Sequence, residues 1–275
     1  MKQSVRCLLL LGLSLILGIL GAFLRSFYFK NALDAGGYLL SRRPEQILYW
    51  VLAAVLILTA LILGRKPSER QEIIERNRKI IRARSLTRAQ RRALQKAAAE
   101  DPSAIRRLKM NDGWLPGTAR ILLGISLLLT AFFMDQALMF YGALRILGLA
   151  AAALLIVDGI LRFLHKQLGI LSGSVFCIFM LLYVVSSYAQ WRGTPEMERF
   201  LVPAAVCLTL LPLSCEMTAW DCGSQLPSLT LILSTLTVFF GISAMGGPGA
   251  EPLHLGAAAW SLIGIWILRK EGEQP

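Results

Sequence analysis

Apolar runs of about twenty residues recur along this chain, and they constrain its fold more than any other feature of the sequence. The hydrocarbon core of a bilayer is about 30 Å thick, so a helix that rises about 1.5 Å per residue crosses it in roughly 20 residues. In lipid every backbone N–H and C=O must be paired within the protein, and a helix pairs its own. With 55% of its 275 residues hydrophobic, the chain is predicted to be an all-α, polytopic transmembrane helical bundle.

The apolar runs predict about eight spans. They cover approximately residues 7–24, 47–64, 115–134, 137–163, 168–189, 200–219, 226–245 and 253–268. A tight turn at Asp135 and Gln136 joins the third span to the fourth, and the turn-forming sequence GGPGAEP joins the last two. The chain then divides into a two-helix transmembrane hairpin (1–64), a basic cytoplasmic helical loop (65–114), a six-helix transmembrane bundle (115–270) and a short cytoplasmic tail (271–275).

The distribution of positive charge predicts the orientation of these spans. Residues 65–120 carry 16 of the 29 Lys and Arg residues. Lys and Arg in short flanking segments are retained on the cytoplasmic side of a membrane. A cytoplasmic amino terminus puts 22 of the 29 on the cytoplasmic side and seven on the other. We therefore expect both termini and the basic loop to be cytoplasmic, with the first apolar run as an uncleaved anchor.

The basic loop has a pattern typical of amphipathic helices rather than of a disordered linker. Thr87 and Gln90 form a capping box before a run of strong helix formers. Apolar side chains recur at about two helical turns, at Ile73, Ile74, Ile80 and Ile81. Positive charges surround them, including Arg82, Arg84, Arg88, Arg91 and Arg92. Both groups are candidate docking residues.

Four interpretations of this loop remain open. It can lie on anionic lipid head groups, or dock a cytoplasmic protein through its apolar stripe. It can bind nucleic acid, which is the less favoured interpretation because no aromatic residues are interleaved with the charges. It can also serve as a topology signal alone, since retention requires only the positive charge.

Two charge pairs are predicted within or beside the fourth span. Asp158 and Arg162 are four residues apart and share one helical face. Arg145 lies one turn into the same span, and Asp135, in the preceding turn, is its expected partner. Charges inside a membrane are costly unless they are paired or hydrated, so such residues are candidate functional sites, although pairs of this kind are more often structural.

Acidic residues also lie near the cytoplasmic end of the sixth span. Pro212 can kink this span, and Glu216 and Asp221 follow it. Together with Asp158 they are the weak candidates for catalytic groups, because carboxylates can supply acid–base chemistry. Glu216 and Asp221 are five residues apart and so do not share one helical face well.

Motifs for cofactors and metals are not found. The five cysteines form no CxxC pair, and the two histidines are too few for a His-based metal site. The sequence contains no Walker lysine loop, HExxH, GxSxG or dinucleotide glycine fingerprint. We therefore expect no cofactor and no metal.

The first hairpin, FLRSFYFKNALDAGGYLLSRRPEQILYW, resembles that of a group of bacterial multi-pass inner-membrane proteins of unassigned activity. The shared features are an arginine that ends the first span, an aromatic stretch, and an Asp or Asn with glycines before a Leu-Leu pair. The resemblance covers about a fifth of the chain. It implies a location in the bacterial cytoplasmic (inner) membrane.

These features predict a non-enzymatic, permease-like or accessory membrane component whose basic loop docks anionic lipid or a protein partner. The main alternative is an intramembrane enzyme that acts on a lipid or polyprenyl substrate through Asp158, Glu216 and Asp221. A secondary transporter is the third hypothesis.

Overall fold

The computed structural model describes residues 3–31, 44–64, 114–164, 168, 170–191, 200–221 and 227–273, without the side chains at 31, 191, 220–221 and 271–273. Within these ranges the chain forms eight α-helices and no strand. The helices are α1 (Gln3–Asn31), α2 (Pro44–Gly64), α6 (Trp114–Phe132), α7 (Tyr141–Phe163), α8 (Ile170–Trp191), α9 (Leu201–Asp221), α10 (Pro227–Ala244) and α11 (Pro252–Glu273). The predicted all-helical class is confirmed.

Seven of these helices, all except α11, are long and apolar enough to cross a membrane. Their outward faces carry large apolar side chains that no part of the described chain covers. Phe23 on α1 is 70% exposed, Ile62 on α2 is 73% exposed and Ile146 on α7 is 72% exposed. A water-soluble protein rarely exposes so much contiguous apolar surface. The chain is therefore a multi-pass membrane protein whose outer surface is suited to lipid.

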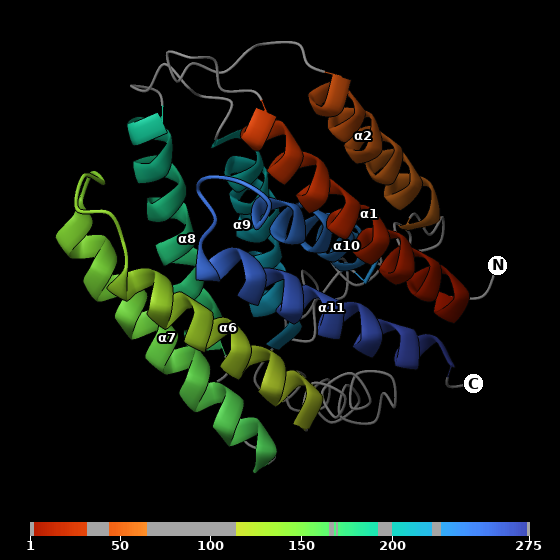
Figure 1. The fold of residues 1–275 in the computed structure, drawn as a ribbon. Helices are drawn as coiled ribbons and strands as arrows, with labels where there is room; N and C mark the ends of the chain where they lie inside the picture. Colours follow the sequence, from red (N-terminus) through yellow and green to blue (C-terminus); the bar gives the residue numbers. More distant parts are fainter. Residues whose placement is uncertain are drawn as a thin grey trace, which may run out of the picture.

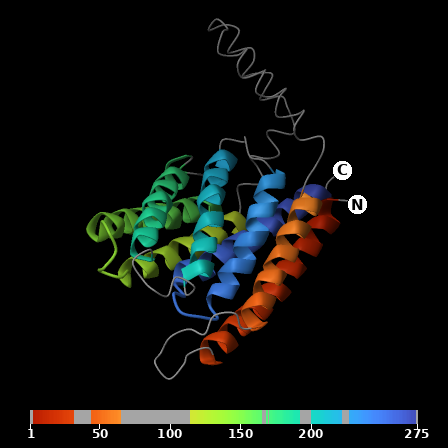
Figure 2. The ribbon, with the colours of Figure 1, turned by 90° about the horizontal axis from the view of Figure 1, so that it is seen from above.

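Helices α6 to α11 form a ring in which each helix packs against the next and α11 closes against α6 (Figure 1). The hairpin of α1 and α2 lies outside the ring, with α1 against α10 and α11, and α2 against α10. Both views place this hairpin on the side of the molecule opposite α7 (Figures 1 and 2). The largest apolar core fills the ring and includes Leu127, Leu155, Phe179 and Leu210.

Consecutive helices run in opposite directions, so α1 begins and α11 ends at the same end of the bundle (Figure 2). We call this the basal end, and the opposite one the apical end. The last residue of α2, Gly64, packs against Ile232 near the start of α10. Thr230, also near the start of α10, lines one cavity with Arg120 of α6. The two helices that flank the basic segment therefore meet it at the basal end.

Glycines allow α6 and α7 to approach closely. A Cβ added at Gly117 of α6 would lie 2.8 Å from the carbonyl oxygen of Gly159 on α7, and one added at Gly159 would lie 2.8 Å from that of Gly117. Real Cβ atoms essentially never come so close to another atom, so a side chain at either position would push the helices apart. This contact lies beside the polar cluster described below.

The connection between α6 and α7 is longer than the sequence predicts. The fourth span was expected to begin directly after Gln136, whereas α7 begins at Tyr141. The N–H of Ala137 donates to Asp135 Oδ1 and the N–H of Leu138 to the Asp135 carbonyl, so this segment forms a turn of its own. Phe140, at the N-cap, has a left-handed φ of 59°. The connection before α11 also turns, with Gly249 at a φ of 77°.

Candidate functional site

The acidic residue predicted inside the fourth span lies at the centre of a buried polar cluster. Asp158 is in the second half of α7, and Arg162 follows one helical turn later on the same face. Arg162 Nε donates to Asp158 Oδ2 at 2.9 Å, and both side chains are fully buried. The structure therefore contains the pair that the four-residue spacing predicts.

A second arginine reaches the same carboxylate from α6. Arg120 lies in the second turn of that helix, and its Nη1 donates to Asp158 Oδ2 and, at 2.9 Å, to Ser172 Oγ of α8. Gly117 lies one turn before Arg120, and Gly159 directly follows Asp158. The close helix contact at these glycines brings the guanidinium within reach of the carboxylate.

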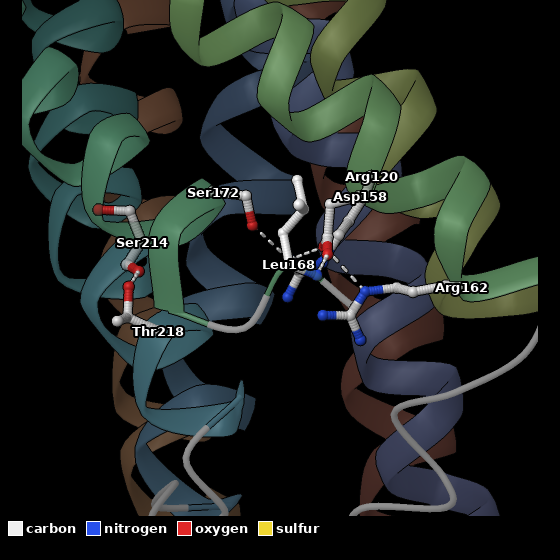
Figure 3. Close-up of polar contacts among 7 residues, drawn as sticks. All are labelled: Arg120, Asp158, Arg162, Leu168, Ser172, Ser214 and Thr218. Carbon is white, nitrogen blue, oxygen red and sulfur yellow. Dashed lines mark hydrogen bonds and ion pairs between the residues drawn. The ribbon is translucent and has the colours of Figure 1, made fainter. Parts of the chain in front are cut away.

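The backbone before α8 completes the cluster. The N–H of Leu168 donates to Asp158 Oδ1 at 2.8 Å. Figure 3 shows Arg120, Arg162 and Leu168 converging on Asp158, while Ser214 and Thr218 of α9 lie apart from it. Both oxygens of Asp158 are thus engaged. We call Arg120, Asp158, Arg162 and Ser172 the basal polar cluster.

Burial makes this cluster sensitive to the loss of any charge. Asp158 and Arg162 are 0% exposed and Arg120 is 3% exposed. Removing a charge from water costs several kcal/mol of free energy. An oppositely charged partner offsets this cost only when the geometry is good and additional hydrogen bonds form. Here one carboxylate lies between two guanidinium groups and a backbone N–H. The arrangement is suited to hold α6, α7 and the start of α8 together, because each of these segments contributes a donor or the acceptor.

Sequence reasoning missed Arg120 as a member of a site. It was counted among the charges of the basic cytoplasmic stretch, whereas the structure places it inside α6, buried within the ring. Arg120 falls within the predicted third span, and α6 begins at Trp114 as that span requires, but its contact with Asp158 depends on how α6 packs against α7. An arginine between the small residues Gly117 and Gly124 was the available signal.

The other two candidate acids lie at the basal end of α9. Glu216 is half-buried, and its Oε2 accepts a hydrogen bond from Thr230 Oγ1 of α10 at 3.3 Å. Asp221 is the last residue of α9, and its side chain lies outside the described residues. Helix α8 stands between α7 and α9 in the ring. Asp158 and Glu216 share no hydrogen bond.

The expected pair of Asp135 and Arg145 is not formed in the structure. Asp135 Oδ2 instead accepts from Gln190 Nε2 of α8 at 2.8 Å. Together with the N–H of Ala137, this amide holds the pKa of Asp135 below its usual range. Arg145 Nη1 donates to Tyr141 Oη at 3.2 Å, and its guanidinium lies over the Tyr141 ring. The turn before α7 directs the Asp135 carboxylate toward α8 rather than along α7.

A second polar cluster lies at the apical end and was not predicted from the sequence. Tyr183 Oη on α8 donates to Glu251 Oε2 at 2.5 Å, and the Glu251 N–H donates to His254 Nδ1 at 3.1 Å. His254 is 1% exposed, and its Nε2 has no hydrogen-bond partner among the described residues. Burial raises the pKa of the Glu251 carboxyl above its usual value. These residues come from distant parts of the sequence, so spacing alone could not group them.

The candidate docking residues of the basic segment lie outside the described residues. They are Ile73, Ile74, Ile80, Ile81, Arg82, Arg84, Arg88, Arg91 and Arg92. Their role therefore stays a prediction from the sequence.

Groups of three or more His, Cys, Asp or Glu side chains that could hold a metal ion are not found among the described residues. Cys177 on α8 and Cys215 on α9 lie with their Sγ atoms 3.2 Å apart as free thiols. No protein-family model, curated protein or solved structure matches this chain.

Proposed function

We propose that this chain is a non-enzymatic, permease-like or accessory component of the bacterial cytoplasmic membrane, whose basic segment, residues 65–114, docks on anionic lipid head groups. The hydrogen bonds that the Asp158 carboxylate accepts support a non-enzymatic function. Its two oxygens accept from Arg120, Arg162 and the Leu168 N–H, which leaves no lone carboxylate facing a substrate. An enzyme that used Asp158 as a general acid or base would need an oxygen within reach of the reacting group.

The proposal takes α11 as the eighth span. This helix has 22 residues, enough to cross a core of about 30 Å at about 1.5 Å per residue. It packs between α10, α6 and α1. Its middle turns present the small buried residues Ala257, Ala258 and Ser261 to these neighbours. A helix that is largely covered by protein needs less apolar surface than one that faces lipid, which accounts for its lower apolarity.

The proposed orientation puts the basal end in the cytoplasm. The basic segment joins two helices that meet it at that end, and α11 ends there with Arg269 and Lys270. The positive charge of these segments then lies on the side where anionic lipid head groups attract it, at about 1 kcal/mol per Lys or Arg near the surface. Anionic lipid is preferred over a protein partner because lipid is present wherever the chain is.

A fluorescence experiment on the full chain in lipid nanodiscs tests the docking role. An environment-sensitive dye is attached at Ile80→Cys, in a background in which the five native cysteines are replaced by serine or alanine. We expect a blue shift in nanodiscs that contain phosphatidylglycerol, relative to phosphatidylcholine alone, because Ile80 enters the interface when the arginines bind head groups.

Two variants define the outcome. Replacing Arg82, Arg84, Arg88, Arg91 and Arg92 by glutamine should abolish the lipid-dependent shift. The matched control carries the same number of changes at the opposite side of the proposed membrane, with Arg42, Arg43, Arg145, Arg192 and Arg199 replaced by glutamine, and should keep it. Equal spectra in both lipids would refute docking on lipid and leave a cytoplasmic protein as the partner to seek.

A further inference from the structure

A small cavity lies at the apical end, where the hairpin of α1 and α2 meets α9. Its volume is about 30 Å³, room for about two water molecules. The residues that line it belong to the last turns of α1 and the first turns of α2 and α9, so it lies near one surface of the proposed membrane. The side chains of the lining that carry a polar group are Arg25, Tyr28, Glu45, Gln46, Tyr49 and Trp50.

The carboxylate of Glu45 is the feature of this cavity that points to a ligand. Its Oε2 atom is buried and has no hydrogen-bond partner among the described residues. A carboxylate oxygen can only accept hydrogen bonds, and a buried one that has lost water without gaining a donor is unfavourable. Native structures contain few such groups. A ligand that places an N–H or O–H donor in the cavity would remove this penalty.

The other charged side chain of the lining, Arg25, is engaged within the protein. Its Nη1 donates to the Ser243 carbonyl oxygen at 3.3 Å, and its guanidinium lies 5.4 Å from the centre of the Phe29 ring. It does not donate to Glu45 Oε2, which has no partner. Its charge nevertheless balances that of Glu45, so the lining is neutral in total. A ligand without net charge therefore fits this lining better than a simple cation or a simple anion.

The donor that suits Glu45 best is an ammonium group. A hydrogen bond between two charged partners is roughly twice as strong as one between neutral groups, and the rings of Tyr49 and Trp50 attract a cation. An ammonium in a ligand without net charge belongs to a zwitterion. Leu201 in the lining is 41% exposed, so the cavity adjoins the surface that faces lipid. A phospholipid head group is the zwitterion available at that surface.

We propose that this cavity binds the head group of phosphatidylethanolamine, whose primary ammonium donates to Glu45 Oε2. The phosphate of the same head group keeps the ligand neutral, and the positive charge of Arg25 attracts it without requiring a free N–H. The site lies at the apical end, whereas the basic segment is joined to the bundle at the basal end. It therefore does not depend on the docking role proposed above.

Thermal unfolding of the purified full chain in mixed micelles tests the site. The detergent is mixed with equal mole fractions of phosphatidylethanolamine, phosphatidylcholine or a glycosyl diacylglycerol with the same acyl chains. None of these lipids has a net charge, so docking of the basic segment contributes equally to all three. A ligand that binds only the folded state raises the unfolding midpoint.

We expect phosphatidylethanolamine to raise the midpoint by several degrees more than the other two lipids. The quaternary ammonium of phosphatidylcholine has no N–H to donate, and the glycosyl lipid has hydroxyl donors but no ammonium. Soluble glycerophosphoethanolamine at the same concentration should have little effect. An equal shift with the glycosyl lipid would overturn the ammonium as the ligand group, and an equal shift with the soluble head group would overturn lipid as its source.

Glutamine variants show whether the effect arises in the cavity. Glu45→Gln keeps the size of the side chain and removes only a charge that has no partner in the protein, so it should fold. It should lose at least half of the difference between phosphatidylethanolamine and phosphatidylcholine. Glu216→Gln, the same change at the basal end and outside the cavity lining, should keep that difference. Equal midpoints in the two lipids would overturn the proposal, and so would an unchanged difference in Glu45→Gln.

Discussion

Arg120 on α6 and Asp158 on α7 form an ion pair in which both side chains are buried within the ring of helices. The pair is extended by Arg162 on α7 and Ser172 on α8, so it spans three consecutive helices. The ion pair therefore acts as a long-range constraint between segments that hydrophobic packing alone would hold less specifically.

Asp158→Asn should lower the stability of the folded protein by roughly 3–5 kcal/mol, because two buried guanidinium groups lose their carboxylate. Replacing the whole trio, as Arg120→Met, Asp158→Leu and Arg162→Met, should cost less than Asp158→Asn alone, since no unpaired charge is left behind. Thermal unfolding in detergent measures both variants. A stability of Asp158→Asn equal to that of the wild type would contradict the role given to the basal polar cluster.

Gly159→Ala should destabilise the protein by about 1–3 kcal/mol, because the added Cβ would approach the Gly117 carbonyl and force α6 away from α7. Gly142→Ala is the matched control on the same helix, since a Cβ there would meet nothing within 4 Å. Alanine also favours a helix over glycine, so the control should be neutral or slightly stabilised. Equal unfolding temperatures for the two variants would contradict the close approach of α6 and α7 at Gly159.

The spans were predictable because long apolar runs have few alternatives in lipid, and seven of the predicted segments correspond to helices apolar enough to cross. The Asp158 and Arg162 pair was predictable because its geometry is local to one helix. The ion pair of Arg120 with Asp158 was not predictable, because it depends on how α6 packs against α7. No spacing of residues within α6 encodes that packing. The same holds for Tyr183 and Glu251, which are 68 residues apart.

Glu251→Gln should change how stability depends on pH. Burial raises the pKa of the Glu251 carboxyl in the folded protein above its ordinary value of 4.5. Below pH 4.5 the carboxyl is protonated in both the folded and the unfolded chain, and burial carries no ionisation penalty. As the pH rises from 4.5 through the raised pKa, the unfolded chain releases its proton first, so the wild type loses stability.

Unfolding midpoints measured between about pH 4 and pH 8 should therefore fall less with rising pH for Glu251→Gln than for the wild type. Asp135→Asn is a contrasting case, and its effect on the pH dependence of stability falls below this pH range. The pKa of Asp135 is lowered in the folded protein, so its contribution is present above the ordinary value of 3.8 and is lost as the pH falls through the lowered pKa. Parallel curves for the wild type and Glu251→Gln would contradict the burial of this carboxyl.

Mild oxidation with copper phenanthroline should join Cys177 to Cys215, because their Sγ atoms already lie 3.2 Å apart between α8 and α9. Mass spectrometry of proteolytic peptides identifies the linked pair. Cys215→Ser should remove the cross-link, and Cys207, which is 2% exposed inside the ring, should remain a free thiol. A Cys207 cross-link formed in preference would require α9 to be rotated relative to the structure.

The number and direction of the spans are tested most directly by paired topology reporters. A green fluorescent protein and an alkaline phosphatase are fused, one at a time, after Lys96 in the basic segment and after Glu273 at the end of α11. Eight spans with a cytoplasmic basal end predict fluorescence and no phosphatase activity at both positions. Phosphatase activity after Glu273 alone would show that α11 does not cross, and activity after Lys96 would contradict the proposed orientation of the chain.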